Sequence, residues 1–237
     1  GGDATDLQIR RDGESMTLSV APQQNDQGQY AIGAWIRDSM AGIGTMTYYD
    51  PESGTFGALG HGITDVDTAQ LMPLASGSIM ETSVKAVKKG EKGEPGQLKG
   101  DFTAQHDVGT VSANTTGGIF GTVAEGDFVS GTALPVAQRS QVTTGPATIL
   151  STVSGDDTRA YQVEIVRLCP MNRDGRDLLL KVTDPQLLET TGGIVQGMSG
   201  SPIIQNGRFV GAVTHVLVND PSQGYGILLE HMLEAVG

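Results

Sequence analysis

Residues 197–215 read GMSGSPIIQNGRFVGAVTH and are the most informative stretch of this sequence. Gly197 and Gly200 flank Ser199, and such small residues allow the backbone to turn sharply. The segment that follows reads as strand, Asn-Gly turn and strand, which is the strongest short-range signal for a β-hairpin. The stretch therefore predicts a tight serine-bearing turn that leads directly into a hairpin.

This turn has a chemical use. A sharp bend projects Ser199 Oγ outward and lets the N–H groups of Gly197 and Ser199 point the same way, which is the arrangement of an oxyanion hole. A Gly/Ser turn without chemistry is common in a chain with 34 glycines. The hairpin directly after the turn favours the catalytic interpretation, because the returning strand can pair with a substrate backbone.

The rest of the chain predicts an all-β fold. Residues 7–20 form two alternating runs around Asp12-Gly13, which indicates another hairpin, and residues 21–29 read as a polar linker. From Tyr30 onward, short apolar segments are separated by glycines: AIGAWI, GIGTMTYYD, FGALGHGI, GIFGTV, AYQVEIVRL and LLLKVTD. Such spacing is typical of a sandwich or barrel, and residues 225–236 are the one convincing helix.

Composition excludes several classes of protein. A net charge of −12 argues against nucleic-acid binding, and no apolar run approaches the ~18 residues of a membrane span. The single cysteine, Cys169, excludes an internal disulfide and a thiolate-rich metal site. No glycine pattern typical of phosphate or dinucleotide binding occurs. We expect no metal and no cofactor.

A serine nucleophile needs a neighbouring base, and histidine is the usual one at neutral pH. His231 falls in the expected helix as a residue of its amphipathic face, and His106 lies in a polar stretch. His215 lies in the strand after the hairpin, where substrate should pair. His61 stands between two glycines at the end of an apolar strand, a setting that exposes an imidazole at a barrel rim. His61 is therefore the expected base.

A carboxylate is expected to orient the imidazole. The residues alone leave this choice open, because each aspartate in question also suits a turn cap or an exposed position. The candidates are Asp184, Asp65, Asp67, Asp101 and Asp107.

Two long stretches closely resemble the SpoIVB peptidases of spore-forming bacteria. They are GIVQGMSGSPIIQNGRFVGAVTHVLVNDPSQGYGILLEHML and IRDSMAGIGTMTYYDPESGTFGALGHGITDVDT, and weaker similarity extends from about Tyr30 to the end. The resemblance implies a secreted serine endopeptidase with a chymotrypsin-like double β-barrel and a short C-terminal helix. It implies that residues 1–29 are the last strands of a PDZ domain plus a linker, with a membrane anchor before them, and that 30–237 are the peptidase domain.

The resemblance also assigns the site. The nucleophile of the family maps to Ser199, its histidine to His61 and its aspartate to Asp184. In typical chymotrypsin-like enzymes the aspartate lies between the histidine and a distant serine, whereas Asp184 precedes Ser199 by only 15 positions. Asp101, 40 positions after His61, is closer to that general spacing. A Ser–His dyad with a structural Asp184 stays open.

In this fold class the segment before the nucleophile and the strand after the hairpin flank the scissile peptide. The expected substrate-binding residues are Gly193, Ile194, Val195, Gln196, Thr214, His215 and Val216. Gly193, Ile194 and Val195 carry no charge, so we expect no strict selection of Arg or Lys in the substrate.

The resemblance implies a biological setting as well. SpoIVB-like peptidases are secreted from the forespore into the intermembrane space, where they cleave the regulatory protein SpoIVFA and themselves. Cleavage of SpoIVFA releases an intramembrane protease that processes pro-sigma-K. The alternative interpretation is a catalytically silent peptide-binding module on the same barrel.

Overall fold

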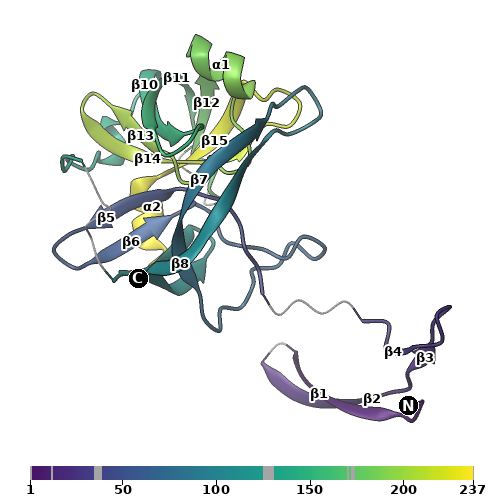
Figure 1. Ribbon diagram of the computed structural model, residues 1–237. Coiled ribbons are helices and arrows are strands. Elements are labelled where there is room, and N and C mark those ends of the chain that lie inside the picture. The colour runs from purple at the N-terminus through teal and green to yellow at the C-terminus, as the bar shows by residue number, and fades with distance from the viewer. Residues whose placement is uncertain are drawn as a thin grey trace. The chain divides into compact units, whose positions relative to one another are not determined.

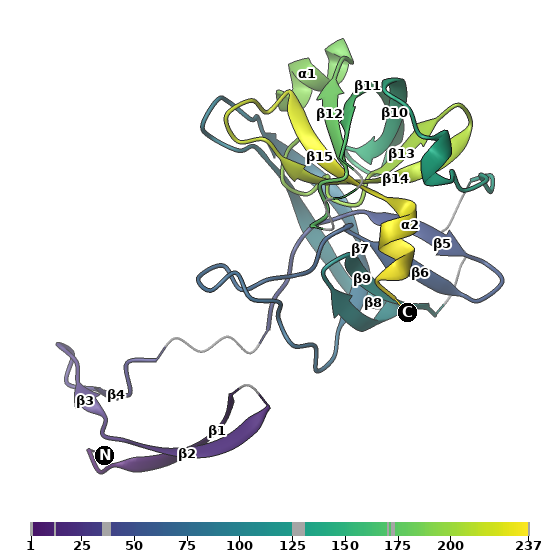
Figure 2. The same cartoon turned by 180° about the vertical axis from the view of Figure 1, so that it is seen from behind.

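The computed structural model describes residues 2–11, 13–34, 39–124, 131–169, 171 and 174–236, with the backbone alone at 102–106. The chain divides into two compact units, Gly1–Ala41 and Gly42–Gly237. Figures 1 and 2 show them from opposite sides.

The first unit consists of two small hairpins. Strands β1 (Thr5–Arg11) and β2 (Glu14–Val20) pair antiparallel, as the sequence predicts. The expected linker at 21–29 is instead part of a second hairpin, in which β3 (Gln23–Gln24) pairs with β4 (Tyr30–Ala31). The Asn25 side chain stabilises its turn by accepting two backbone N–H groups. The PDZ interpretation of residues 1–29 stays a prediction.

The second unit begins with a five-stranded antiparallel sheet in the order β5-β6-β9-β8-β7 (Figure 1). Its strands are β5 (Met46–Asp50), β6 (Thr55–Ala58), β7 (Ser78–Lys88), β8 (Gln97–Thr115) and β9 (Gly118–Val123). Phe56, Val111 and Ile119 are buried together between these strands. The sheet is a half-barrel that stays open among the described strands.

The remaining strands close into a barrel in the order β10-β11-β12-β15-β14-β13. They are β10 (Gly145–Thr152), β11 (Thr158–Leu168), β12 (Leu178–Val182), β13 (Pro202–Gln205), β14 (Arg208–Val216) and β15 (Gln223–Leu228). Alternate side chains of β11 are buried in the barrel, as a strand with one solvated face requires. The all-β fold class is confirmed.

The predicted hairpin after Ser199 is confirmed in detail. Strands β13 and β14 pair antiparallel around Asn206 and Gly207, whose φ angles are 51° and 71°. Two consecutive positive φ values define the type I′ turn that Asn-Gly favours.

The predicted C-terminal helix is shorter than expected. Residues up to Leu228 belong to β15, and helix α2 spans only Leu229–Glu234. Periodicity in 225–236 suits a helix, but β15 pairs with both β12 and β14 and so closes the barrel. Tertiary pairing therefore overrides the local pattern.

Other elements differ from the sequence predictions as well. Helix α1 (Pro185–Thr191) was missed, although an aspartate followed by proline is a typical helix start. A short 3-10 helix, η1, spans Arg139–Gln141. Of the expected strand AIGAWI, Ala31 ends β4, residues 32–34 are in no strand, and Trp35-Ile36 lie outside the described residues. No helix in the described part of the chain is long and apolar enough to cross a membrane.

Candidate active site

Ser199 occupies a tight turn that leads into β13. Gly197 and Gly200 have φ angles of 100° and 93°, a region that side-chain-bearing residues rarely adopt. A Cβ at Gly200 would lie only 2.1 Å from the carbonyl oxygen of Thr45. Glycine is therefore required at position 200 both by its backbone conformation and by close packing.

Gly200→Ala should disrupt this turn. We expect it to lower the free energy of unfolding by roughly 3 kcal/mol or more, because conformational strain and a backbone clash add. Gly207→Ala is the matched control, since Gly207 also has positive φ (71°) but nothing lies within 4 Å of its would-be Cβ. Urea unfolding of both variants would measure the difference. Equal destabilisation would contradict the packing argument.

Backbone hydrogen bonds tie the serine turn to the other half of the peptidase unit. The Thr45 N–H donates to Ser199 O at 2.8 Å, and the carbonyl of Thr45 accepts the Leu59 N–H at 3.2 Å. On its other side, the Gly200 N–H donates to Val213 O on β14. The turn is thus held between the half-barrel and the closed barrel.

The Ser199 hydroxyl donates to the carbonyl oxygen of Thr214 at 2.9 Å. Thr214 lies where the register of β14 against β15 shifts between Val213 and His215, a β-bulge of the kind often found beside active sites. Its own hydroxyl donates to Gly175 O at 2.6 Å and is buried. Thr214, in this bulge, therefore contacts both Ser199 and the 174–177 loop.

His61 follows two residues in left-handed conformation, Leu59 (φ 69°) and Gly60 (φ 71°). A Cβ at Gly60 would lie 2.9 Å from the Thr214 side chain, so the His61 segment packs directly on β14. His61 Nδ1 lies 2.9 Å from the carbonyl oxygen of Gly62. Because a carbonyl only accepts, this contact requires a proton on Nδ1 and leaves Nε2 of the neutral ring as the free base.

His215 lies beside His61, with ring centroids 5.1 Å apart and planes inclined by 37°. Burial, with smaller contributions from the nearby charges of His61 and Arg176, lowers the pKa of His215 to about 4. Its Nδ1 is buried and has no hydrogen-bond partner in the described part of the chain. His215 is therefore neutral at pH 7.

The structure does not place the Asp184 carboxylate in hydrogen-bond contact with His61. Asp184 is the N-cap of α1, where one carboxylate oxygen accepts the Leu187 N–H at 3.0 Å and the other accepts the Gln162 N–H at 3.2 Å. No hydrogen bond joins it to His61 among the described residues, and α1 lies at the outer end of the closed barrel (Figure 1). An aspartate in extended conformation before a proline is preset for this capping geometry.

The other aspartates take ordinary positions. Asp101 is exposed on β8 opposite Ser83, and Asp107 is exposed on the same strand. Asp65 accepts the backbone N–H groups of Asp67 and Thr68 in a turn.

The two predicted substrate segments differ in character. The expectation for residues 193–196 concerns their backbone; the side chains of Ile194 and Val195 are 2% exposed and belong to the barrel core. The Ile194 N–H donates to Pro221 O and the Gln196 N–H to Gly96 O, which uses the donors that a substrate would need. A Cβ at Gly193 would meet Pro221 O, so this backbone too is enclosed.

The strand after the hairpin is more accessible. His215 and Val216 pair with β15, whereas the pairing of β14 with β13 ends at Ala212. One edge of residues 214–216, on the side of Ser199, therefore has no strand partner in the described structure. Such an edge can accept an extended peptide.

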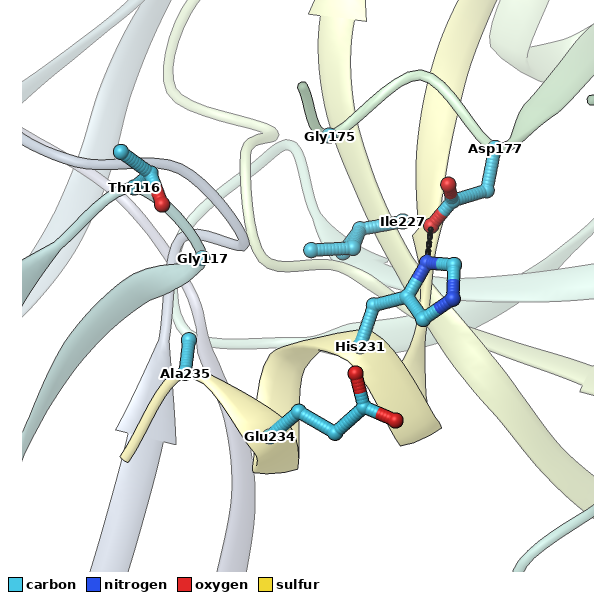
Figure 3. Close-up of a pocket in the computed structure, with 8 residues that line it drawn as sticks. All are labelled: Thr116, Gly117, Gly175, Asp177, Ile227, His231, Glu234 and Ala235. Carbon is cyan, nitrogen blue, oxygen red and sulfur yellow. Dashed lines mark hydrogen bonds and ion pairs between the residues drawn. The ribbon is translucent and has the colours of Figure 1, made fainter. Parts of the chain in front are cut away.

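A buried hydrogen bond between His231 and Asp177 was not predicted. His231, expected on an amphipathic face, is 9% exposed, and its Nδ1 lies 2.9 Å from Asp177 Oδ2 (Figure 3). The same oxygen accepts the Leu228 N–H at 2.8 Å. Burial raises the pKa of Asp177, and the hydrogen bonds from Leu228 and His231 oppose this rise. No sequence signal links two residues 54 positions apart.

The described side chains contain no cluster of three or more His, Cys, Asp or Glu residues that could hold a metal ion. The site is therefore built from a serine, two imidazoles and backbone groups.

Comparisons with known proteins agree with this chemistry. Residues 28–233 match the family model described as SpoIVB peptidase S55. No curated protein matches the sequence significantly.

Two solved structures from Mycobacterium tuberculosis are similar. The active form of the Rv3671c protease is 12% identical over 86% of this chain and 93% of its own, with a TM-score of 0.40. An inactive serine-to-alanine form from strain H37Rv is 16% identical over 60% and 68%, also with a TM-score of 0.40. Because the family match spans most of the sequence, the chain belongs to the SpoIVB peptidase S55 family and is a serine peptidase.

Proposed function

We propose that the chain is a serine endopeptidase in which Ser199 is the nucleophile and His61 the general base. The observation that carries this proposal is the convergence of the Ser199 turn and the His61 segment on Thr214. In this resting arrangement the Ser199 hydroxyl is bound to Thr214 O rather than to His61. Catalytic hydrogen bonds are often long or poorly aligned without substrate and tighten when it binds, so in this proposal the Ser199 hydroxyl leaves Thr214 O for His61 Nε2 in the substrate complex.

The oxyanion hole in this proposal consists of the N–H groups of Gly197 and Ser199. Neither N–H is donated to an acceptor among the described residues, whereas the neighbouring N–H groups of Met198, Gly200 and Ser201 all are. Unpaired donors are rare in a well-packed turn, and a developing oxyanion would satisfy them.

In the first step Ser199 Oγ attacks the substrate carbonyl carbon while its proton moves to His61 Nε2. Gly62 O holds the opposite ring nitrogen and so fixes the tautomer. His61 then gives this proton to the leaving amine, and water hydrolyses the acyl-enzyme by the same route. The substrate backbone pairs with the free edge of residues 214–216.

In this proposal Ser199 and His61 form a dyad, and Asp184 serves only as the N-cap of α1. Asp184→Ala should lower the free energy of unfolding by about 1 kcal/mol, the usual effect of losing an N-cap, with little change in activity. Asp184→Asn should keep activity and the helix cap, since asparagine caps equally well. It should lose only the hydrogen bond from the Gln162 N–H, because an amide nitrogen cannot accept it. Thermal unfolding and peptide cleavage of the two variants test this. A fall in kcat of about 10⁴ for Asp184→Asn at unchanged Tm would instead make Asp184 the orienting carboxylate.

We further propose a SpoIVFA-like regulator and the chain itself as substrates, with secretion from the forespore into the intermembrane space. The support is family membership. The PDZ interpretation of residues 1–29 belongs to the same proposal. Incubation of the purified chain with a SpoIVFA-like protein, with Ser199→Ala in parallel, tests the substrate. Intact regulator in both samples would refute it.

A further inference from the structure

The buried carboxylate of Asp177 is not explained by stability alone. Its side chain is 0% exposed, and Oδ1 has no hydrogen-bond partner among the residues that the structure describes, although Oδ2 accepts two. An incompletely satisfied buried carboxylate costs free energy, and apolar residues of similar size often serve a core better. A group of this kind beside an active site suggests a functional role.

Asp177 joins the C-terminal helix to a loop of the closed barrel. Figure 3 shows Gly175 and Asp177 on this loop, with His231 of α2 reaching up to the carboxylate. The pair borders a cavity of about 190 Å³ that Thr116, Glu234 and Ala235 also line. The side-chain hydrogen bonds of Asp177 hold this loop to Leu228 and α2 at the edge of the cavity, in addition to the backbone hydrogen bond from Cys169 N–H to Asp177 O.

Two successive hydrogen bonds, both made by Thr214, connect the same loop to Ser199. The carbonyl of Gly175 accepts the buried Thr214 hydroxyl at 2.6 Å, and the carbonyl of Thr214 accepts the Ser199 hydroxyl at 2.9 Å. Thr214 lies in the β-bulge, where the ladder to β15 is interrupted and side-chain contacts can decide the position of the backbone.

We infer that Asp177 is a positioning residue for Ser199 and acts through Gly175 and Thr214. Its carboxylate fixes the 174–177 loop, the loop fixes the bulge, and the bulge sets where the Ser199 hydroxyl lies. His231, which lies on α2, supports this arrangement through its hydrogen bond to the Asp177 carboxylate. This inference rests on the proposed role of Ser199 as nucleophile.

A double-mutant cycle tests the inference with Asp177→Ala and Thr214→Val. Alanine removes the carboxylate oxygen that the Leu228 N–H and His231 contact, and valine keeps the shape of threonine but removes the hydroxyl. The readout is labelling of Ser199 by a fluorophosphonate probe, separated into the maximal rate and the half-saturating probe concentration. We expect each single variant to lower the maximal rate about tenfold and the double variant to be no slower than either, because both break one chain of contacts.

Two further variants separate positioning from general loss of stability. Gln205→Ala removes buried hydrogen bonds to Thr143 and Pro146 elsewhere in the barrel and should lower Tm without slowing labelling. His231→Asn should retain more of the labelling rate than His231→Ala, since the asparagine amide can donate to Asp177 from the position of Nδ1.

The outcomes are distinguishable. Labelling of the wild type at a residue other than Ser199 would refute the proposed function itself. Labelling of wild-type Ser199 combined with single-variant effects that multiply to about a hundredfold in the double variant would overturn only the inference. Wild-type labelling rates in both single variants would overturn it as well.

Discussion

Replacement of Ser199 by alanine should abolish peptide cleavage and self-cleavage while the protein stays folded. Loss of a nucleophilic serine lowers kcat by about 10⁶ where this has been measured in another serine peptidase. The fold should persist because the hydroxyl makes one hydrogen bond, to Thr214 O, and the turn is held by backbone contacts of Ser199 and Gly200. Cleavage of a peptide library and circular dichroism measure the two effects.

The neighbouring serine of the same motif provides the matched control. Ser201 is 0% exposed and its hydroxyl donates to Ser151, away from the proposed oxyanion hole. Ser201→Ala should therefore cost some stability and leave cleavage largely intact. Wild-type cleavage by the Ser199→Ala protein would remove Ser199 from the mechanism.

Replacement of His61 by alanine should have the second large effect. Without a base the serine keeps its proton, so we expect kcat to fall by about 10⁴ to 10⁶. Little destabilisation should accompany this, because the His61 side chain is only half-buried and its one hydrogen bond is to the adjacent carbonyl. Single-turnover cleavage at pH 7 and thermal unfolding measure both quantities.

His215→Ala distinguishes the two imidazoles. His215 has a pKa of about 4 and packs beside His61, so its loss should loosen the site and reduce activity less than the loss of His61. A His215→Ala protein that is inactive beside a nearly normal His61→Ala protein would reverse the assignment.

Much of this site could be predicted because its determinants are local. Gly197, Gly200 and the Asn-Gly turn act on their own backbone, and φ angles of 100°, 93°, 51° and 71° bear out what these residue types favour. The all-β fold could be predicted for the same reason, since glycine-punctuated apolar strands are a short-range pattern.

Predictions that depended on distant partners were less successful. Residues 225–228 carry a helix-like pattern but lie between two strands that need a partner. Ile194 and Val195 lie close to Ser199 in the sequence, but only the closed barrel shows that their side chains pack in its core. His231 looks amphipathic in sequence, and only the return of α2 to the 174–177 loop buries it against Asp177.

The serine turn and the hairpin after it follow from local sequence, because each depends on the conformational freedom of neighbouring residues. The contact of His61 with His215, the capping role of Asp184 and the link from Asp177 to Ser199 through Thr214 arise only in the folded chain. These relations join residues that lie far apart in the chain. Their geometry depends on the closure of the barrel and the packing of the half-barrel on β14, which no local pattern encodes.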